Sequence, residues 1–316
     1  MASLEMIARA TKLRPLSKEP QEKFLERITN LSLHSKRLNS MANLDVCPNL
    51  RILFLYNNQI ARIENLSFAT SLIHLYLENN QITEIEQLNG LRHLTKLFLD
   101  GNMISRLQGL EDCTSLEEVH LSNQRLPDGE CFSFDEDVLD RLSESLVTLT
   151  LNNSHVSSVA PLRLLVNLHV LRCNENQIEY LEEIEQIIIA CNLLQEIDFS
   201  SNPASAVPGY RDCLIENSEL LQVIDDRAVK PNQRAFLHAR SSRRKNSSHS
   251  RVSGGINSKA FSFGAGGQLS TRKTTTAKFM KRSSTFHERP IETNSALSGF
   301  LNVGSVNINR FNQKHF

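Results

Sequence analysis

The stretch LFLYNNQIARIENL, residues 53–66, decides the fold because it returns twice along the chain. The same pattern reads LYLENNQITEIEQL at residues 75–88 and LFLDGNMISRLQGL at residues 97–110. Each copy starts 22 residues after the one before it. Leucine, isoleucine and asparagine keep their places while the residues between them vary. A fixed period of this length predicts a solenoid, in which each repeat packs only against its neighbours.

The form LxxLxLxxNxIxxIxxL, with a period in the twenties, is the sequence mark of a leucine-rich repeat. We therefore predict an α/β leucine-rich repeat solenoid of about eight repeats, with short parallel strands on its concave face. An insertion at 126–145 lengthens one repeat, and its DEDVLDRLSESL segment predicts a helix. This insertion is either a longer helix on the convex side or a partner-specific loop. The repeats start at Ile28, Leu50, Leu72, Leu94, Leu116, Leu146, Leu168 and Leu194.

One asparagine position in each repeat predicts an asparagine ladder. A buried amide there can bond the backbone of the turn that follows the strand. The side chains at this position are, in order, Lys36, Asn58, Asn80, Asn102, Gln124, Ser154, Asn176 and Asn202. We expect Lys36, Gln124 and Ser154 to break the ladder.

The ends of a solenoid need caps, because a terminal repeat cannot bury its outer apolar face. Residues 1–27 carry helix-like patterns split by Pro15 and Pro20 and predict a helical N-terminal cap. The repeats occupy 28–202, and residues 203–231 predict a C-terminal cap that ends at Pro231. The remainder, 232–316, is rich in Ser, Thr, Gly, Arg and Lys, which predicts a disordered tail.

The formal net charge of zero hides a division of the chain. Of the 35 Lys+Arg and 35 Asp+Glu residues, 15 basic and 2 acidic ones fall in 232–316. This leaves 20 basic and 33 acidic residues in 1–231, so an acidic body of about −13 precedes a basic tail of about +13. Such asymmetry points to an electrostatic partner.

The cysteines and the hydropathy indicate the compartment. No two cysteines have C-x-x-C spacing, so we expect buried reduced thiols rather than a metal site, in a reducing compartment. No apolar run approaches the roughly 20 residues that a membrane span needs, and no signal-peptide h-region is present. We expect a soluble intracellular protein without membrane contact. The cysteines are Cys47, Cys113, Cys131, Cys173, Cys191 and Cys213.

Alternating strand residues should point outward from the concave face, and some of them are unusual for a solvent surface. Aromatic side chains recur on adjacent strands, and acidic ones flank them, which is typical of a hot spot for a basic partner. The alternative is that the aromatic residues merely suit a strand surface. The predicted partner-binding residues are Phe54, Tyr56, Tyr76, Glu78, Phe98, Asp100, Glu118, His120, Arg172 and Asp198.

Catalysis is not expected. His120 has no Ser, Cys or second His at a catalytic spacing, and we read it as a surface polar residue. The chain contains no Gly-rich phosphate loop, metal cluster or nucleophile elbow, so no enzyme activity and no cofactor are expected.

The tail holds basic runs, such as 243–245 and 272–273, that would bind acidic surfaces. The alternative is a solvated charged tail without a partner. Acidic tubulin tails, nucleic acid or the acidic body itself fit this charge. Nucleic acid is disfavoured, because few aromatic residues accompany the charge as single-strand binding requires. Ser247 and Ser283 follow basic residues and resemble kinase sites, where phosphate would weaken such contacts.

Several segments resemble the SDS22-like leucine-rich repeat proteins, some of which regulate protein phosphatase 1. They are EMIARATKLRP at 5–15, the run at 53–88, QRLPDGE at 124–130, FDEDVLDRLSESLVTLTLNN at 134–153 and NPASAVPGYRD at 202–212. The resemblance covers about 1–230 and implies binding of the phosphatase catalytic subunit. It also implies a location at microtubules, the centrosome or a cilium in the cytoplasm.

The usual phosphatase docking motif, a basic residue followed by Val-x-Phe, has no clean match. RVSGG at 251–255 lacks the Phe, and KAFSF at 259–263 has Phe261 in place of Val or Ile. We therefore expect a phosphatase to contact the concave face. The alternatives are a structural axonemal or microtubule-associated protein that binds tubulin through its tail, and a nuclear RNA–protein scaffold.

Overall fold

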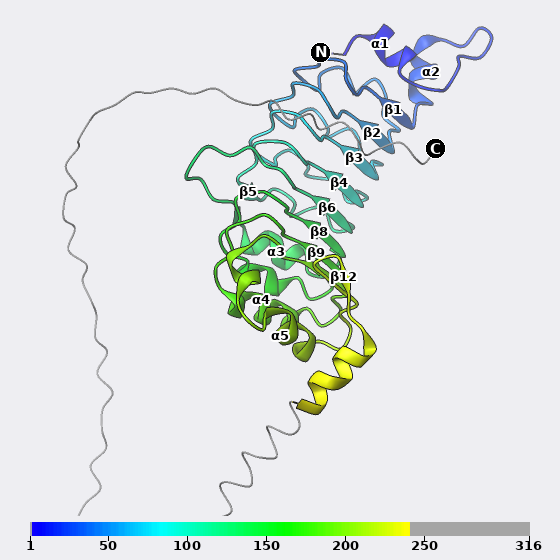
Figure 1. Ribbon diagram of the computed structural model, residues 1–316. Helices are drawn as coiled ribbons and strands as arrows, with labels where there is room; N and C mark the ends of the chain where they lie inside the picture. Colours follow the sequence, from blue (N-terminus) through cyan, green and yellow to red (C-terminus); the bar gives the residue numbers. More distant parts are fainter. Residues whose placement is uncertain (1, 241–316) are drawn as a thin grey trace, which may run out of the picture. The chain divides into compact units, whose positions relative to one another are not determined.

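The computed structural model describes residues 2–240, which lie in one compact unit. A ten-stranded sheet runs through this part of the chain, and the strands are parallel from β1 to β11 (Figure 1). This arrangement confirms the predicted leucine-rich repeat fold. The strands in spatial order are β1 (Asn30–Ser32), β2 (Ile52–Phe54), β3 (His74–Tyr76), β4 (Lys96–Phe98), β6 (Glu118–His120), β8 (Thr148–Thr150), β9 (Val170–Arg172), β10 (Glu196–Asp198), β11 (Val223–Ile224) and the antiparallel β12 (Arg227–Ala228).

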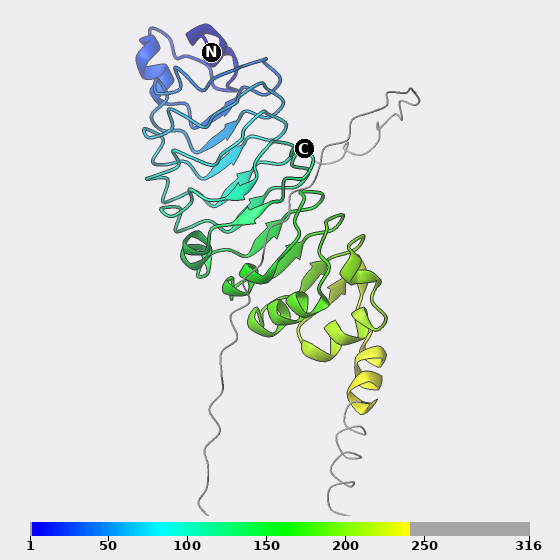
Figure 2. The same ribbon diagram turned by 90° about the vertical axis from the view of Figure 1, so that its left-hand side faces the viewer.

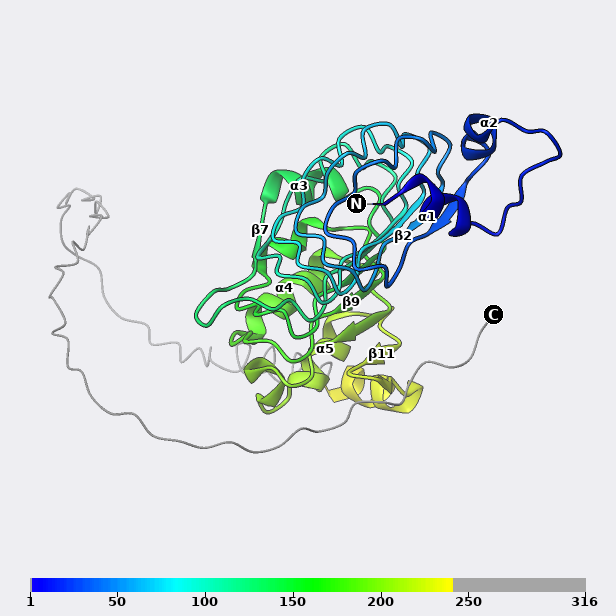
Figure 3. The same cartoon turned by 90° about the horizontal axis from the view of Figure 1, so that it is seen from above.

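The register pairs equivalent residues of successive repeats. Leu53 lies opposite Leu75, which lies opposite Leu97, and all three are fully buried. The core thus lies behind the sheet, and seen from above the first repeats superimpose as turns of one coil (Figure 3). In the later repeats helices replace loops on the side away from the strands (Figure 2). These are α3 (Glu136–Leu142), η1 (Ala160–Leu164), α4 (Leu181–Ala190), η2 (Pro203–Ala206) and α5 (Tyr210–Asn217).

The asparagine ladder is present. The Asn80 Oδ1 atom accepts a hydrogen bond from the Ile60 N–H at 3.1 Å, and Nδ2 donates to the Leu77 carbonyl at 2.9 Å. Ser154 does not break the ladder, because its Oγ atom donates to the Leu121 carbonyl at 2.7 Å. Gln124 does not break it either, contrary to the prediction. Its Oε1 accepts from the Ile104 N–H at 2.9 Å, because a longer amide side chain still reaches the turn.

The insertion forms the predicted helix α3. Asp135 caps it by accepting a hydrogen bond from the Asp137 N–H at 3.1 Å, and its Val138, Leu139 and Leu142 side chains are buried. One short strand inside the insertion also pairs with a short strand of the preceding repeat, and the sequence did not predict this pair. The two strands are β5 (Arg106–Leu107) and β7 (Ser133–Phe134).

The N-terminal cap contains two helices, α1 (Leu4–Arg9) and α2 (Gln21–Glu26), as the sequence predicted. The Ser32 N–H donates to the Ala10 carbonyl at 3.2 Å, which ties the cap to β1. Ile7 of α1 and Phe24 of α2 are buried and extend the core beyond the first repeat. The apolar end of the solenoid is therefore covered.

The C-terminal cap extends past its predicted end at Pro231. Residues 231–240 are helical, and Leu237 in this segment is buried. The Arg234 guanidinium donates to the Leu221 carbonyl at 2.5 Å, and the Arg240 guanidinium pairs with Glu216 at 3.2 Å. The prediction was wrong here because both arginines read as members of the basic tail. The disorder predicted for 241–316 lies outside the described residues.

Replacing Leu237 by Ala should release this terminal helix. Its side chain is the apolar anchor of 231–240, and a Leu→Ala change in a core costs about 2–5 kcal/mol. We expect fast amide exchange in 231–240 while exchange in the sheet stays slow, because the loss is local. Phe236→Ala is the matched control, since Phe236 is 65% exposed. Slow exchange in the Leu237→Ala variant would contradict this assignment.

Candidate partner-binding face

The solvent side of the sheet from β1 to β10, hereafter the sheet face, carries the predicted partner-binding residues. Strands β2, β3 and β4 each bury their middle residue and turn the residues on either side outward. The strand register places Phe54 beside Tyr76 and Tyr76 beside Phe98. Phe98 in turn lies beside His120. Side chains 22 residues apart in sequence therefore meet in one column.

Four rings of this column form a continuous pile, hereafter the ring stack: Phe54, Tyr76, Phe98 and His120. Neighbouring ring centroids lie 4.6, 4.6 and 4.4 Å apart, and the planes are within 21° of parallel. This distance is close to the roughly 4.8 Å between strands, so the sheet itself sets the stacking. The inner rings cover one another's faces, so their edges are the part left to solvent. All four residues are half-buried.

Further rings widen the aromatic surface. His34 stacks on Tyr56 at 4.7 Å, and Tyr56 meets Phe54 edge to face at 6.5 Å. His74 meets Tyr76 edge to face at 6.3 Å. His34 and His74 were not among the predicted partner-binding residues, and His120 was predicted there as a polar group rather than as a stacked ring. The sequence signal that could have found these rings is their position beside strand residues that point outward.

Two carboxylates stand side by side along one flank of the ring stack. Burial, with a contribution from Asp100, raises the pKa of Glu78 to about 7. Burial also raises the pKa of Asp100, although the Ser122 N–H donates to its Oδ1 atom at 2.6 Å. The Glu78 Oε2 atom is shielded from solvent and has no hydrogen-bond partner within residues 2–240. Burial therefore makes ionisation of both carboxyl groups less favourable than it is in water.

The other flank of the ring stack is electrically balanced. Glu118 accepts from the Lys96 ammonium group at 2.8 Å, and this contact raises the pKa of Lys96. His120 Nε2 lies 3.8 Å from Glu118, and its Nδ1 lies 3.1 Å from the Thr150 hydroxyl. Burial lowers the pKa of His120, against the pull of nearby carboxylates. The neutral imidazole thus completes the ring stack.

In the β8–β10 half of the sheet face, the charged side chains pair with groups of the chain itself. Arg172 pairs with Glu196 and, at 3.6 Å, with Asp226. Asp198 is 1% exposed and accepts from the Ser200 hydroxyl and the Asn174 amide, both at 2.6 Å. Burial would raise the pKa of Asp198, but these hydrogen bonds and Arg172 bring it below its usual value. Asp198 was predicted to touch a partner; its burial leaves no surface for that contact.

Replacing Glu78 by Gln should stabilise the protein at alkaline pH. Folding raises the pKa of Glu78 from 4.5 to about 7, so the folded state binds more protons in this window, and stability falls as pH rises through it. The full shift corresponds to about 3 kcal/mol, reduced to about 1–2 kcal/mol for a half-buried group. Urea unfolding should show this gain at pH 8 and none at pH 4.5. A gain independent of pH would contradict the assignment.

All six cysteines are free. Cys47, Cys113, Cys173 and Cys191 are buried as predicted, whereas Cys213 is half-buried and Cys131 is exposed, contrary to the prediction. Burial raises the pKa of the Cys47 thiol to about 11 and that of the Cys113 thiol to about 12. Within residues 2–240, no cluster of His, Cys, Asp and Glu side chains could hold a metal ion. Nor does any helix in this part of the chain have the length and apolar character needed to cross a membrane.

The described residues thus form a leucine-rich repeat solenoid with an aromatic and acidic sheet face. Residues 48–104 match the family model described as leucine rich repeat. Internalin C2 from Listeria monocytogenes is similar in structure, with 22% identity over 70% of this chain and 91% of that chain and a TM-score of 0.55. An LRR protein from Leptospira interrogans shows 24% identity over 65% of this chain and a TM-score of 0.53, and this chain spans 51% of its length. At these identities the likeness is one of fold.

Proposed function

We propose that this protein is a non-catalytic scaffold that binds a partner protein on the β2–β6 half of its sheet face. The ring stack is the observation that carries this proposal, because solvent-facing aromatic groups on a rigid sheet bury much area at low entropy cost. Glu78 and Asp100 beside it favour a basic partner surface and speed its approach. Arg172 and Glu196 compensate each other, so the β8–β10 half offers less to a partner.

For the identity of the partner we propose the catalytic subunit of protein phosphatase 1. The support is the resemblance to the SDS22-like proteins and, more specifically, to the testis leucine-rich repeat protein, a regulatory subunit of that phosphatase. The scaffold would then hold the phosphatase at microtubules or the centrosome. Because the chain has no clean Val-x-Phe docking motif, the sheet face is the proposed contact.

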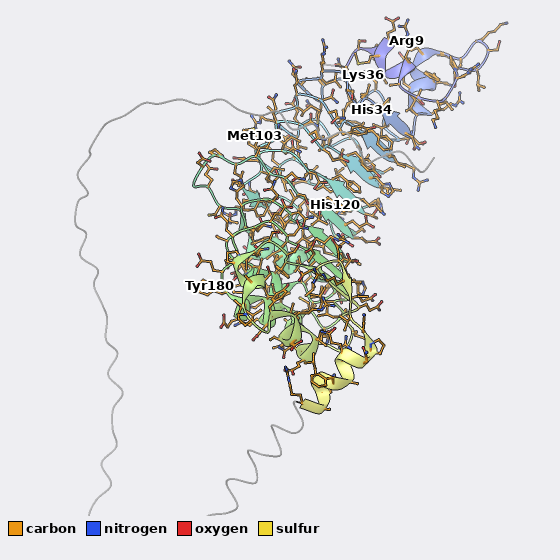
Figure 4. The ribbon with its side chains drawn as sticks, viewed as in Figure 1. Arg9, His34, Lys36, Met103, His120 and Tyr180 are labelled. Carbon is orange, nitrogen blue, oxygen red and sulfur yellow. The ribbon has the colours of Figure 1, made fainter. Side chains whose placement is uncertain are left out.

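Affinity capture tests this proposal. The full-length protein is immobilised and challenged with the purified phosphatase catalytic subunit, and we expect specific, saturable capture. Tyr180→Ala is the control variant, because Tyr180 is 60% exposed and lies away from the strands (Figure 4). Its capture should equal that of the wild type. Absence of capture by the wild-type protein would refute the phosphatase as partner.

A second candidate function rests on the charge of 241–316, which contains 13 basic and 2 acidic residues once Arg234 and Arg240 of the cap are excluded. The protein would then be a structural axonemal or microtubule-associated protein that binds acidic tubulin tails without any phosphatase. Co-sedimentation with microtubules separates the two functions. Deletion of 241–316 should abolish pelleting under this alternative, whereas unchanged pelleting would exclude it.

A further inference from the structure

We propose that Glu78 and Asp100 together receive one cationic side chain, preferably an arginine, from the surface of the partner. The inference deepens the proposed function of the sheet face, because it names the group of the partner that this face recognises. Under this proposal the sheet face recognises a charged group of the partner only beside the ends of β3 and β4, where Glu78 and Asp100 lie.

The backbone holds the two carboxylates on neighbouring rungs. Tyr76 pairs with Phe98, and Glu78 and Asp100 each follow two residues later. The backbone hydrogen bonding between β3 and β4 continues past the strands, since the Asn79 N–H donates to the Asp100 carbonyl at 2.8 Å. Two residues that project from one face at adjacent rungs lie about 5 Å apart at their Cβ atoms. A single cation can therefore contact both carboxylates.

No lysine or arginine of the described chain pairs with these carboxylates, although His120 interacts electrostatically with Asp100 and acts to lower its pKa. Within residues 2–240, no Lys or Arg nitrogen forms an ion pair with Glu78 or Asp100, whereas Lys96 is held by Glu118 at 2.8 Å. The Glu78 Oε2 atom lacks any donor on its shielded side. Glu78 is only half-buried, so the remainder of its side chain is open to a group that approaches from solvent. A counter-ion can come from a partner.

The surroundings suit an arginine in particular. A planar guanidinium has five donors and can bridge two carboxylates, which an ammonium group does less well. The edges of Tyr76 and Phe98 lie beside the pair and can cover the aliphatic stem of the incoming side chain. Burial raises the pKa of both carboxyl groups, and perturbed pKa values cluster at functional sites.

Capture of the phosphatase catalytic subunit by full-length variants tests this site. The double variant Glu78→Gln/Asp100→Asn keeps side-chain shape and removes both charges. We expect its affinity to fall at least about 30-fold and to lose much of its salt dependence. Glu196→Gln is the matched control, since that carboxylate already pairs with Arg172, and its affinity should stay within about twofold. Wild-type affinity in the double variant would overturn the site.

Failure to capture the phosphatase would refute the proposed partner but not the cation site. A second measurement therefore tests the cation site without the phosphatase. Carbon-13 NMR of the Glu78 carboxyl is followed through a pH titration with N-acetyl-arginine amide. We expect this probe to lower the pKa of Glu78, because a bound cation favours the carboxylate. The neutral isostere N-acetyl-citrulline amide should leave the pKa unchanged. Equal effects of the two probes, or no effect of either, would overturn the cation site.

Discussion

Replacing Phe54 and Phe98 together by alanine should weaken capture of the phosphatase catalytic subunit at least 100-fold. Truncation of a central aromatic hot spot costs about 2–4 kcal/mol, and these two rings bracket Tyr76 in the ring stack. Their removal takes away contact area and also the stacking that holds Tyr76 in place. Titration of the immobilised full-length variant with phosphatase measures the loss.

The double variant should remain folded, because Phe54 and Phe98 are half-buried and the leucines beneath them are untouched. Far-ultraviolet circular dichroism and the urea midpoint verify this. The Tyr180→Ala variant, which loses an exposed aromatic on the other side, should bind as the wild type does. Undiminished capture by a folded double variant would refute the ring stack as the contact.

Replacing Asn80 by alanine should lower the stability of the protein strongly. Its amide accepts from the Ile60 N–H and donates to the carbonyls of Leu55 and Leu77 at 3.0 and 2.9 Å. Each buried backbone group left without a partner costs about 1–3 kcal/mol, so we expect a loss of about 3–5 kcal/mol in urea unfolding.

Gln81→Ala is the matched control for the ladder variant. Gln81 is the exposed neighbour of Asn80, and its substitution should change stability by less than about 0.5 kcal/mol. A loss below about 1 kcal/mol in the Asn80→Ala variant would show that water replaces the amide in this turn. The ladder would then not hold successive repeats together.

The fold was predictable because one period fixes both strand register and core. The 22-residue spacing of Leu53, Leu75 and Leu97 reappears as direct strand pairing. Features that do not follow the 22-residue period could not be predicted from the sequence. The helix at 231–240 depends on Arg234 and Arg240, whose contacts lie 13 to 28 residues away and follow no repeat.

The candidate site was predictable in position but not in detail. Strand alternation alone assigns Phe54, Tyr76 and Phe98 to one face, because the side-chain period of a strand is two. Stacking of the rings depends on rotamers, which sequence spacing does not specify. The burial of Asp198 likewise depends on hydrogen bonds from Ser200 and Asn174 that only the folded chain brings together.

Hydroxyl-radical footprinting of the full-length protein, with and without the phosphatase catalytic subunit, tests the central claim most directly. Aromatic side chains report the contact, and Tyr180 serves as an internal reference on the other side of the molecule. We predict strong protection of Phe54, Tyr76 and Phe98 and unchanged oxidation of Tyr180. Protection of Tyr180 with an unprotected ring stack would contradict binding at the sheet face.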